Sequence, residues 1–263
     1  MPGTATENYH YSQYYPDKSL CDYVKFFYYF HSDDTVPERI LPFGTTEITI
    51  RMDGDNNNIF ITNPATRSYH VKPGSLHRTV GICFQPWALN SLFKIPQHLL
   101  SNTKLPLGDV LGKEFDKLSA LLMGITNYSD VLRLLQTYLV NTITAPQNPL
   151  IIDAIRYVDR GNGLVDMQDL YKRYNISERR LQQLFNYAIG MSPKKYCLLK
   201  RFHLAVTRLK AGSNLTDLAL GLHYYDQAHF IHDFSSFAGI CPGDFMKEKN
   251  TLNHINTNAY FRN

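Results

Sequence analysis

Residues 223–233, HYYDQAHFIHD, bring three histidines and two aspartates into eleven positions. Histidine and aspartate are common metal ligands, and two histidines three residues apart on a helix, such as His229 and His232, can converge on one ion. On a helical wheel, however, His232 points away from the side of Asp233, and neither a cysteine nor an H-E-x-x-H element lies nearby. We therefore expect no metal and no other cofactor here. A hydrogen bond between His229 and Asp233 that braces the helix is the preferred interpretation.

The same stretch also suits a helix that lies in a DNA groove. With Asp226 as its N-cap, a helix over 226–238 turns Phe230, Phe234 and Phe237 inward. Small, polar and apolar side chains that could meet base edges then face outward. They are Ala228, Ile231, His232 and Ser235.

A second segment, SERRLQQLFNYAIG, has a similar design. Ser177 is a suitable N-cap, Gly190 a suitable C-cap, and Leu181, Leu184, Phe185 and Ala188 form the inward face. Arginine can pair with guanine, and glutamine or asparagine with adenine, so the opposite face suits major-groove reading. An ordinary solvent-exposed face is the alternative. The candidate base-reading residues on this face are Arg179, Gln182, Gln183 and Asn186.

Both segments lie in a half of the chain that is helical nearly throughout. Each is preceded by a short helix and a break, at Asn175 and at residues 223–225, and a long helix over 193–210 lies between them. The two N-caps, Ser177 and Asp226, are 49 residues apart. This pattern predicts two helix-turn-helix units joined by the long helix.

The basic charge is concentrated in the first of these units. Residues 166–211 hold 10 basic and 3 acidic residues, whereas residues 212–250 hold 2 basic and 5 acidic ones. A basic surface can contact phosphates, which adds affinity without reading sequence. The candidate phosphate contacts are Lys172, Arg173, Arg180, Lys194, Lys195, Lys200 and Arg201.

The segments ISERRLQQLFNYAIGMSPKKYCLLKRFHLA and LTDLALGLHYYDQAHFIHDFSSFAGICPGDF resemble the DNA-binding domain of the AraC/XylS family of bacterial transcription regulators. The resemblance covers about residues 150–247. It implies two helix-turn-helix units that each insert one helix into successive major-groove segments of double-stranded DNA. By position, the resemblance implies that the base-reading residues are Arg179, Gln182 and Gln183 in the first unit, and Gln227, Ala228, Ile231 and His232 in the second.

The second unit departs from the family pattern. His223 stands where the family usually has glycine, and His232, Ser235 and Ser236 replace residues that are often basic. We therefore expect the first unit to supply most of the affinity for DNA, and the second to add a smaller contribution to sequence reading.

The first half of the chain is β-rich. Residues 45–52 and 79–84 alternate with a period of two, residues 53–58 form a turn and residues 59–62 a returning strand. Helical periodicity follows over 114–125 and 129–143, and residues 145–149 suit a joint. The predicted class is α+β. A β-rich barrel or sandwich with two helices spans 1–145, and we expect this domain to sense a ligand or to oligomerise. Arg39, Glu47, Arg51 and Trp87 could line a pocket in it, but each is equally explained as a barrel-face or rim residue. The DNA-binding domain spans 146–250, and a tail spans 251–263.

An enzyme that borrows a DNA-binding module is the rival class. No P-loop, G-x-S-x-G motif, zinc tetrad or activated Cys–His pair occurs, and Cys83 alternates like a buried strand residue. No signal peptide or membrane-length apolar run is recognisable, and the four scattered cysteines suit a reducing compartment. We thus expect a bacterial, cytoplasmic, nucleoid-associated regulator and not an enzyme. A small-molecule effector of unknown identity, RNA polymerase and a second copy of the chain are the further candidate partners.

Overall fold

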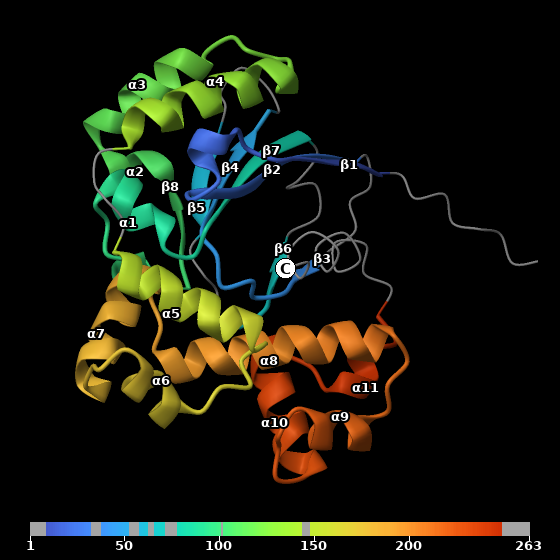
Figure 1. The fold of residues 1–263 in the computed structure, drawn as a ribbon. Coiled ribbons are helices and arrows are strands. Elements are labelled where there is room, and N and C mark those ends of the chain that lie inside the picture. Colours follow the sequence, from blue (N-terminus) through green and yellow to red (C-terminus); the bar gives the residue numbers. More distant parts are fainter. Residues whose placement is uncertain are drawn as a thin grey trace, which may run out of the picture.

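The structure is a computed structural model, and it describes residues 9–32, 38–52, 58–62, 66–71, 78–100, 102–143 and 148–248. Figure 1 shows a β-sheet between two helical layers, with α3 and α4 on one side and the helices from α5 onward on the other. The strands are β1 (Tyr9–Tyr14), β2 (Val24–Ser32), β3 (Glu38–Ile40), β4 (Glu47–Arg51), β5 (Asn58–Thr62), β6 (Tyr69–Val71), β7 (Arg78–Phe84) and β8 (Lys104–Pro106). The α-helices are α1 (Ala88–Phe93), α2 (Leu107–Leu111), α3 (Lys113–Leu122), α4 (Tyr128–Thr142), α5 (Pro149–Arg160), α6 (Met167–Arg173), α7 (Glu178–Ile189), α8 (Pro193–Lys210), α9 (Leu215–Gly221), α10 (Gln227–Ala238) and α11 (Pro242–Phe245). Short 3-10 helices span Lys18–Leu20 and Gln97–Leu100.

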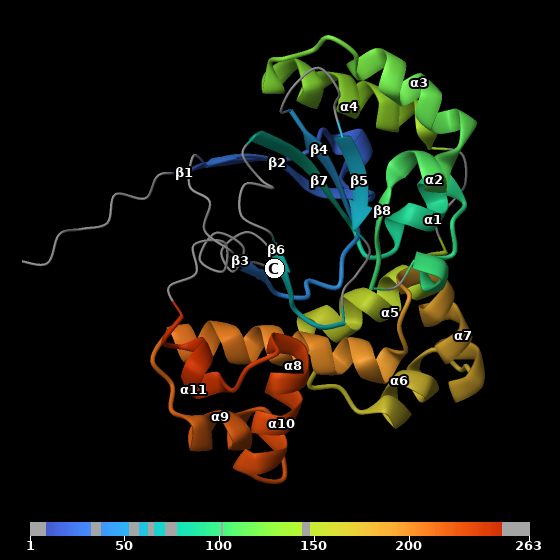
Figure 2. The same cartoon turned by 180° about the vertical axis from the view of Figure 1, so that it is seen from behind.

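The predicted α+β class is confirmed. The main sheet is antiparallel, with strand order β1-β2-β7-β4-β5-β8, and β3 pairs with β6 in a separate two-stranded sheet. In Figures 1 and 2 the small sheet lies between the main sheet and α8. The predicted strands at 45–52, 59–62 and 79–84 correspond to β4, β5 and β7. The predicted turn at 53–58 and the joint at 145–149 fall largely outside the described residues, as does the tail at 251–263.

The main sheet has one apolar and one polar face because strand side chains alternate. Ile48 and Ile50 lie on the apolar face, in a core that includes buried residues of α3 and α4. The sequence periodicity predicts that Phe115, Leu118, Leu121 and Leu122 share one buried face of α3. Leu118 and Leu122 are buried, but Leu121 is 51% exposed. The side chain of Leu121 lines a surface cavity between α3 and α4, so this part of the prediction was wrong.

The opposite face, here called the polar face, also carries the buried Phe26 and Phe30, and its polar residues and cysteine are Tyr11, Tyr28, Glu47, Thr49, Arg51, Thr79 and Cys83. The Tyr28 hydroxyl donates to a Glu47 carboxylate oxygen at 3.3 Å, and the rings of Tyr11 and Tyr28 stack with centroids 6.0 Å apart. Burial raises the pKa of Tyr28, and the negative charge of Glu47 adds to the shift. Burial and Glu47 also raise the pKa of Tyr69 on β6. The polar face is therefore a largely water-excluded surface with many hydrogen-bonding groups.

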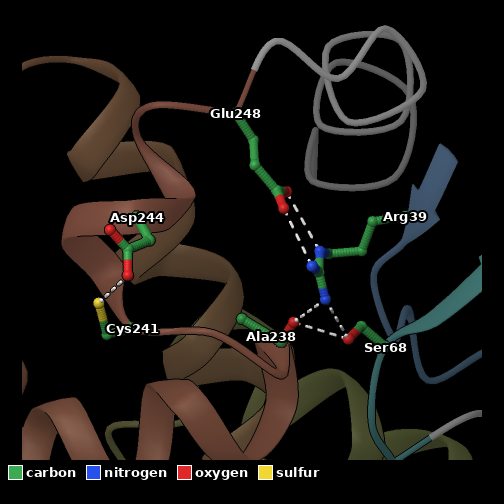
Figure 3. Close-up of polar contacts among 6 residues, drawn as sticks. All are labelled: Arg39, Ser68, Ala238, Cys241, Asp244 and Glu248. Carbon is green, nitrogen blue, oxygen red and sulfur yellow. Dashed lines mark hydrogen bonds and ion pairs between the residues drawn. The ribbon is translucent and has the colours of Figure 1, made fainter. Parts of the chain in front are cut away.

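Arg39 on β3 connects the first half of the chain to the C-terminal end of α10 (Figure 3). Its guanidinium donates to both carboxylate oxygens of Glu248, at 3.1 and 2.9 Å, and to the Ala238 carbonyl at 3.0 Å. Ser68 donates to the same carbonyl through its hydroxyl, at 2.6 Å, and to the Phe237 carbonyl through its backbone N–H, at 2.7 Å. These bonds satisfy carbonyls that the end of a helix leaves without a partner.

The loop after β3 forms a second contact, against α8. The ring of His203 bonds through Nε2 to the Pro42 carbonyl at 2.8 Å. Burial holds the pKa of His203 well below its usual range, and the nearby Lys200 and Lys25 charges lower it further. The imidazole is therefore neutral and donates its proton to the carbonyl. Gly44, with φ +71°, lies so close to α8 that an added Cβ would stand 2.6 Å from Leu199 Cδ2.

Candidate nucleic-acid interface

The first helix-turn-helix unit consists of α6, the turn at 174–177 and α7. Asn175 takes a left-handed conformation with φ +46°, which lets the chain reverse between the helices. The Ser177 hydroxyl oxygen then accepts from the Arg180 backbone N–H at 3.3 Å and caps α7. At the other end Gly190 closes the helix with φ +73°. The positions of the start, stop and turn thus agree with the sequence signals.

The side chains of α7 divide into a core face and an exposed face. Leu181, Phe185 and Ala188 are buried, and Leu184 is half-buried. The exposed side chains include every candidate base-reading residue of this unit, namely Arg179, Gln182, Gln183 and Asn186. The amide of Gln182 donates to the Glu178 carboxylate at 3.0 Å. The first recognition helix therefore presents both donors and acceptors to solvent.

The second unit consists of α9, the turn at 222–226 and α10. This turn is one residue longer than the first, and His223 takes the left-handed conformation with φ +58° where a glycine would be unstrained. The Asp226 carboxylate accepts from the His229 backbone N–H at 2.7 Å and caps α10. Phe230, Phe234 and Phe237 are buried, as predicted.

The outer face of α10 is exposed and only weakly charged. Gln227, Ala228 and His232 are exposed and Ile231 is half-buried. Asp233 lies near both histidines, 3.8 Å from His229 Nε2 and 3.4 Å from His232 Nδ1, so the expectation that His232 points away from Asp233 was wrong. Among the described residues no group of three or more histidine, cysteine, aspartate or glutamate side chains is arranged to hold a metal ion.

The long helix α8 joins the two units through a shared core. Its buried residues include Tyr196, Leu199, Phe202 and Val206, and one hydrophobic cluster contains them together with core residues of α7 and α10. The ring of Phe202 lies 5.1 Å from that of Phe234, measured between centroids. Because α8 packs against both recognition helices, it fixes their relative position.

The candidate phosphate contacts fall into two groups. Lys172, Arg173, Arg180 and Lys194 are exposed. Lys200, by contrast, is only 15% exposed and forms an ion pair with Asp159 at 2.9 Å. It faces the buried His203 rather than solvent, which corrects the prediction for this residue.

Lys195 and Arg201 belong to the second group because both are half-buried, and each packs on an aromatic ring. The Lys195 ammonium lies 4.3 Å from the centroid of Phe237, and the Arg201 guanidinium lies 5.6 Å from that of Tyr224. These contacts place two positive charges beside the core of the second unit.

One flank of α7 contacts the first half of the chain, which the sequence did not indicate. A cavity of about 490 Å³ is lined by Arg180, Gln183, Leu184 and Tyr187 of α7, and by Trp87 beside α1. Trp87 is buried, and its indole N–H donates to the Asp22 carbonyl at 2.9 Å. Part of the outer surface of the first recognition helix therefore borders the sheet domain.

Comparisons with known proteins match both halves of the chain. Residues 170–248 match the family described as "Helix-turn-helix domain", and residues 12–106 match a "Domain of unknown function (DUF6597)". No curated protein matches the chain. No helix among the described residues is long and apolar enough to cross a membrane.

Several solved structures are similar to the chain at low identity. The C-terminal domain of AraT, a response regulator from Geobacillus stearothermophilus, is 17% identical, with 39% of this chain and 88% of that chain covered and a TM-score of 0.37. ToxT from Vibrio cholerae is 12% identical, with 91% and 98% covered and a TM-score of 0.39. A structure of unsaturated fatty acid bound wild-type ToxT is 11% identical, with 90% of each chain covered and a TM-score of 0.38.

The match over residues 170–248 agrees with the two capped helix-turn-helix units described above. This part of the chain is therefore an AraC-type helix-turn-helix domain, the DNA-binding part of a transcription regulator.

Proposed function

We propose that this regulator reads DNA by inserting α7 and α10 into successive major-groove segments. The observation that supports this reading is that two capped helices with exposed polar faces pack on one rigid helix, α8. Base-reading side chains near the N-terminus of such a helix reach base edges in the major groove. The residues that we propose for this role are Arg179, Gln182, Gln183, Asn186, Gln227, Ala228, Ile231 and His232.

We further propose that the first unit supplies most of the electrostatic affinity. Lys172, Arg173, Arg180 and Lys194 are the exposed cations that would contact phosphates, and all of them belong to the first unit or to the start of α8. Lys195 and Arg201 would add to them from partly covered positions. Lys200 is left out because Asp159 already neutralises it.

The sheet domain, residues 1–145, is the proposed sensor, and the polar face is its proposed ligand site. Tyr11, Thr49 and Thr79 each place a buried hydroxyl there, and no described group hydrogen-bonds to any of the three. A buried polar group without a partner costs about 1–3 kcal/mol. A small polar ligand that bonds these hydroxyls would recover that cost. RNA polymerase and a second copy of the chain are the other partners that we propose.

Selection of bound duplexes from a random DNA pool tests the DNA-reading proposal. We expect two enriched blocks about one helical turn apart, roughly 10 bp. Enrichment of a single block would mean that one unit alone reads bases. Salt-sensitive binding without any enrichment, repeated in the presence of candidate effectors, would contradict the proposal.

The balance between the units is tested by two variants. Arg180→Ala should lower affinity and reduce the slope of log affinity against log salt by about one unit. His232→Ala should change that slope little, because the outer face of α10, where His232 lies, is only weakly charged. Equal losses in the two variants would contradict the proposed dominance of the first unit.

A further inference from the structure

Three glutamines are proposed to read bases, and they differ in what holds their amide groups. Gln182 donates through Nε2 to the Glu178 carboxylate at 3.0 Å, one helical turn earlier on α7. Gln227 accepts through Oε1 from the Thr216 hydroxyl at 3.2 Å. Gln183 lines the cavity beside Trp87. Only the first of these arrangements involves a carboxylate, among the contacts of the described residues.

Whether the side-chain amide can rotate by 180° depends on whether its hydrogen-bond partner can donate as well as accept. A hydroxyl both donates and accepts, so either end of the Gln227 amide can face Thr216. An ionised carboxylate only accepts, so the NH₂ end of Gln182 must face Glu178. The amide of Gln182 is thus held in one orientation, with its carbonyl oxygen and its second N–H directed elsewhere.

Glu178 also lies near the first helix of the unit. Burial raises the pKa of Tyr171 on α6, and the charge of the nearby Glu178 carboxylate raises it further. The carboxylate that receives the amide of Gln182 is therefore close to α6 as well as to the exposed face of α7.

The free edge of the Gln182 amide matches one base better than the others. A carbonyl oxygen beside an N–H complements the N6 donor and N7 acceptor of adenine. An amide that can rotate by 180° would present either its oxygen or its nitrogen to each adenine atom, and would lose part of this discrimination.

We propose that Glu178 is a specificity-determining residue, which orients the amide of Gln182 toward adenine without contacting DNA. This inference rests on the proposed base-reading role of Gln182. A carboxylate at the first position of a DNA-facing helix also repels phosphates. Its cost in affinity is therefore accompanied by a gain in discrimination at one base pair.

The test compares the binding of full-length variants to duplexes taken from the selected DNA motif. Gln182→Ala first identifies the position at which base preference is lost, and duplexes with each of the four base pairs at that position are then compared. Asp169→Ala is the matched control, because it removes one exposed carboxylate from α6 of the same unit.

The wild-type protein should prefer adenine at that position by about tenfold or more, the discrimination of a good bidentate contact. Glu178→Ala should reduce the preference to about twofold while base preferences elsewhere persist. Asp169→Ala should leave the preference intact. Glu178→Gln keeps the size of the side chain but both donates and accepts, so it should lose the preference as well.

The outcomes distinguish a failure of the orienting role of Glu178 from a failure of the base-reading role of Gln182. If Gln182→Ala changes base preference at no position, the base-reading role of Gln182 fails. If Gln182→Ala abolishes a preference that Glu178→Ala and Glu178→Gln both retain, the role of Glu178 alone is overturned. A preference restored by Glu178→Gln would also overturn it, since a packing role would then suffice.

Discussion

Replacement of Arg39 by methionine should weaken the contact between β3 and the C-terminal end of α10. Methionine keeps much of the length of the side chain but cannot donate the two hydrogen bonds to Glu248 or the bond to the Ala238 carbonyl. Arg39 is only 10% exposed, so its loss also leaves the Glu248 carboxylate without its cation. The perturbation therefore removes both hydrogen bonds and charge compensation.

The expected cost follows from the burial of the two partners. Exposed ion pairs contribute about 0–1 kcal/mol, whereas removal of one partner from a buried pair costs about 3–5 kcal/mol. Glu248 remains 33% exposed and can bind water, and the Ala238 carbonyl retains its bond from the Ser68 hydroxyl. We therefore expect Arg39→Met to lower the free energy of unfolding by about 2 kcal/mol.

A double-mutant cycle with Glu248→Gln measures the interaction itself. Urea unfolding can be followed by the fluorescence of Trp87, the single tryptophan, which is buried in the cluster shared by the two halves. The coupling energy should be about 1 kcal/mol. Arg133→Met is the control, because Arg133 is 80% exposed and pairs with Asp130 at 3.4 Å. If Arg39→Met costs no more than this control, the reasoning is refuted.

Three further changes have expected outcomes. His203 is neutral in the folded protein but titrates near pH 6.5 in the unfolded chain. The free energy of unfolding should therefore fall as the pH drops below about 6.5, by at most ~1.4 kcal/mol per pH unit for this group. Urea titrations at pH 5–7.5 should show a flatter dependence for His203→Gln. His223→Gly should raise the free energy of unfolding by about 1 kcal/mol, because it relieves a left-handed residue, whereas Asn175→Gly should change it less because asparagine tolerates this conformation. Gly44→Ala should cost about 1–3 kcal/mol more than Gly124→Ala, since both have positive φ but only Gly44 faces a neighbouring side chain; equal losses would contradict the predicted clash.

The helices, caps and turns of the second half could be predicted because each leaves a local signal. Ser177 and Asp226 stand directly before apolar periodicity, and Asn175 tolerates the left-handed conformation that a tight turn needs. In the first half, the alternation of Ile48 and Ile50 similarly indicated a half-buried strand. These features depend on neighbours within a few residues.

The contacts between the two halves of the chain could not be predicted, because no sequence periodicity relates residues that are far apart in the chain. Arg39 and Glu248 are 209 positions apart, and neither residue type indicates which opposite charge it will meet. Lys200 was assigned to phosphates because it lies in a basic stretch, yet its position on α8 turns it toward Asp159. Helical periodicity shows which side of α8 is polar, but not which surface covers that side.

The single core around α8 restricts how this regulator can diverge. An 18-residue helix is about 27 Å long, and its packing against α7 and α10 fixes the spacing between the two stretches of DNA that we propose they read. A substitution inside this core alters both units at once, whereas one on the outer face of α7 or α10 alters a single contact. New target sequences are therefore accessible by single surface substitutions at constant spacing. A change of spacing would require rebuilding the helix and everything packed on it.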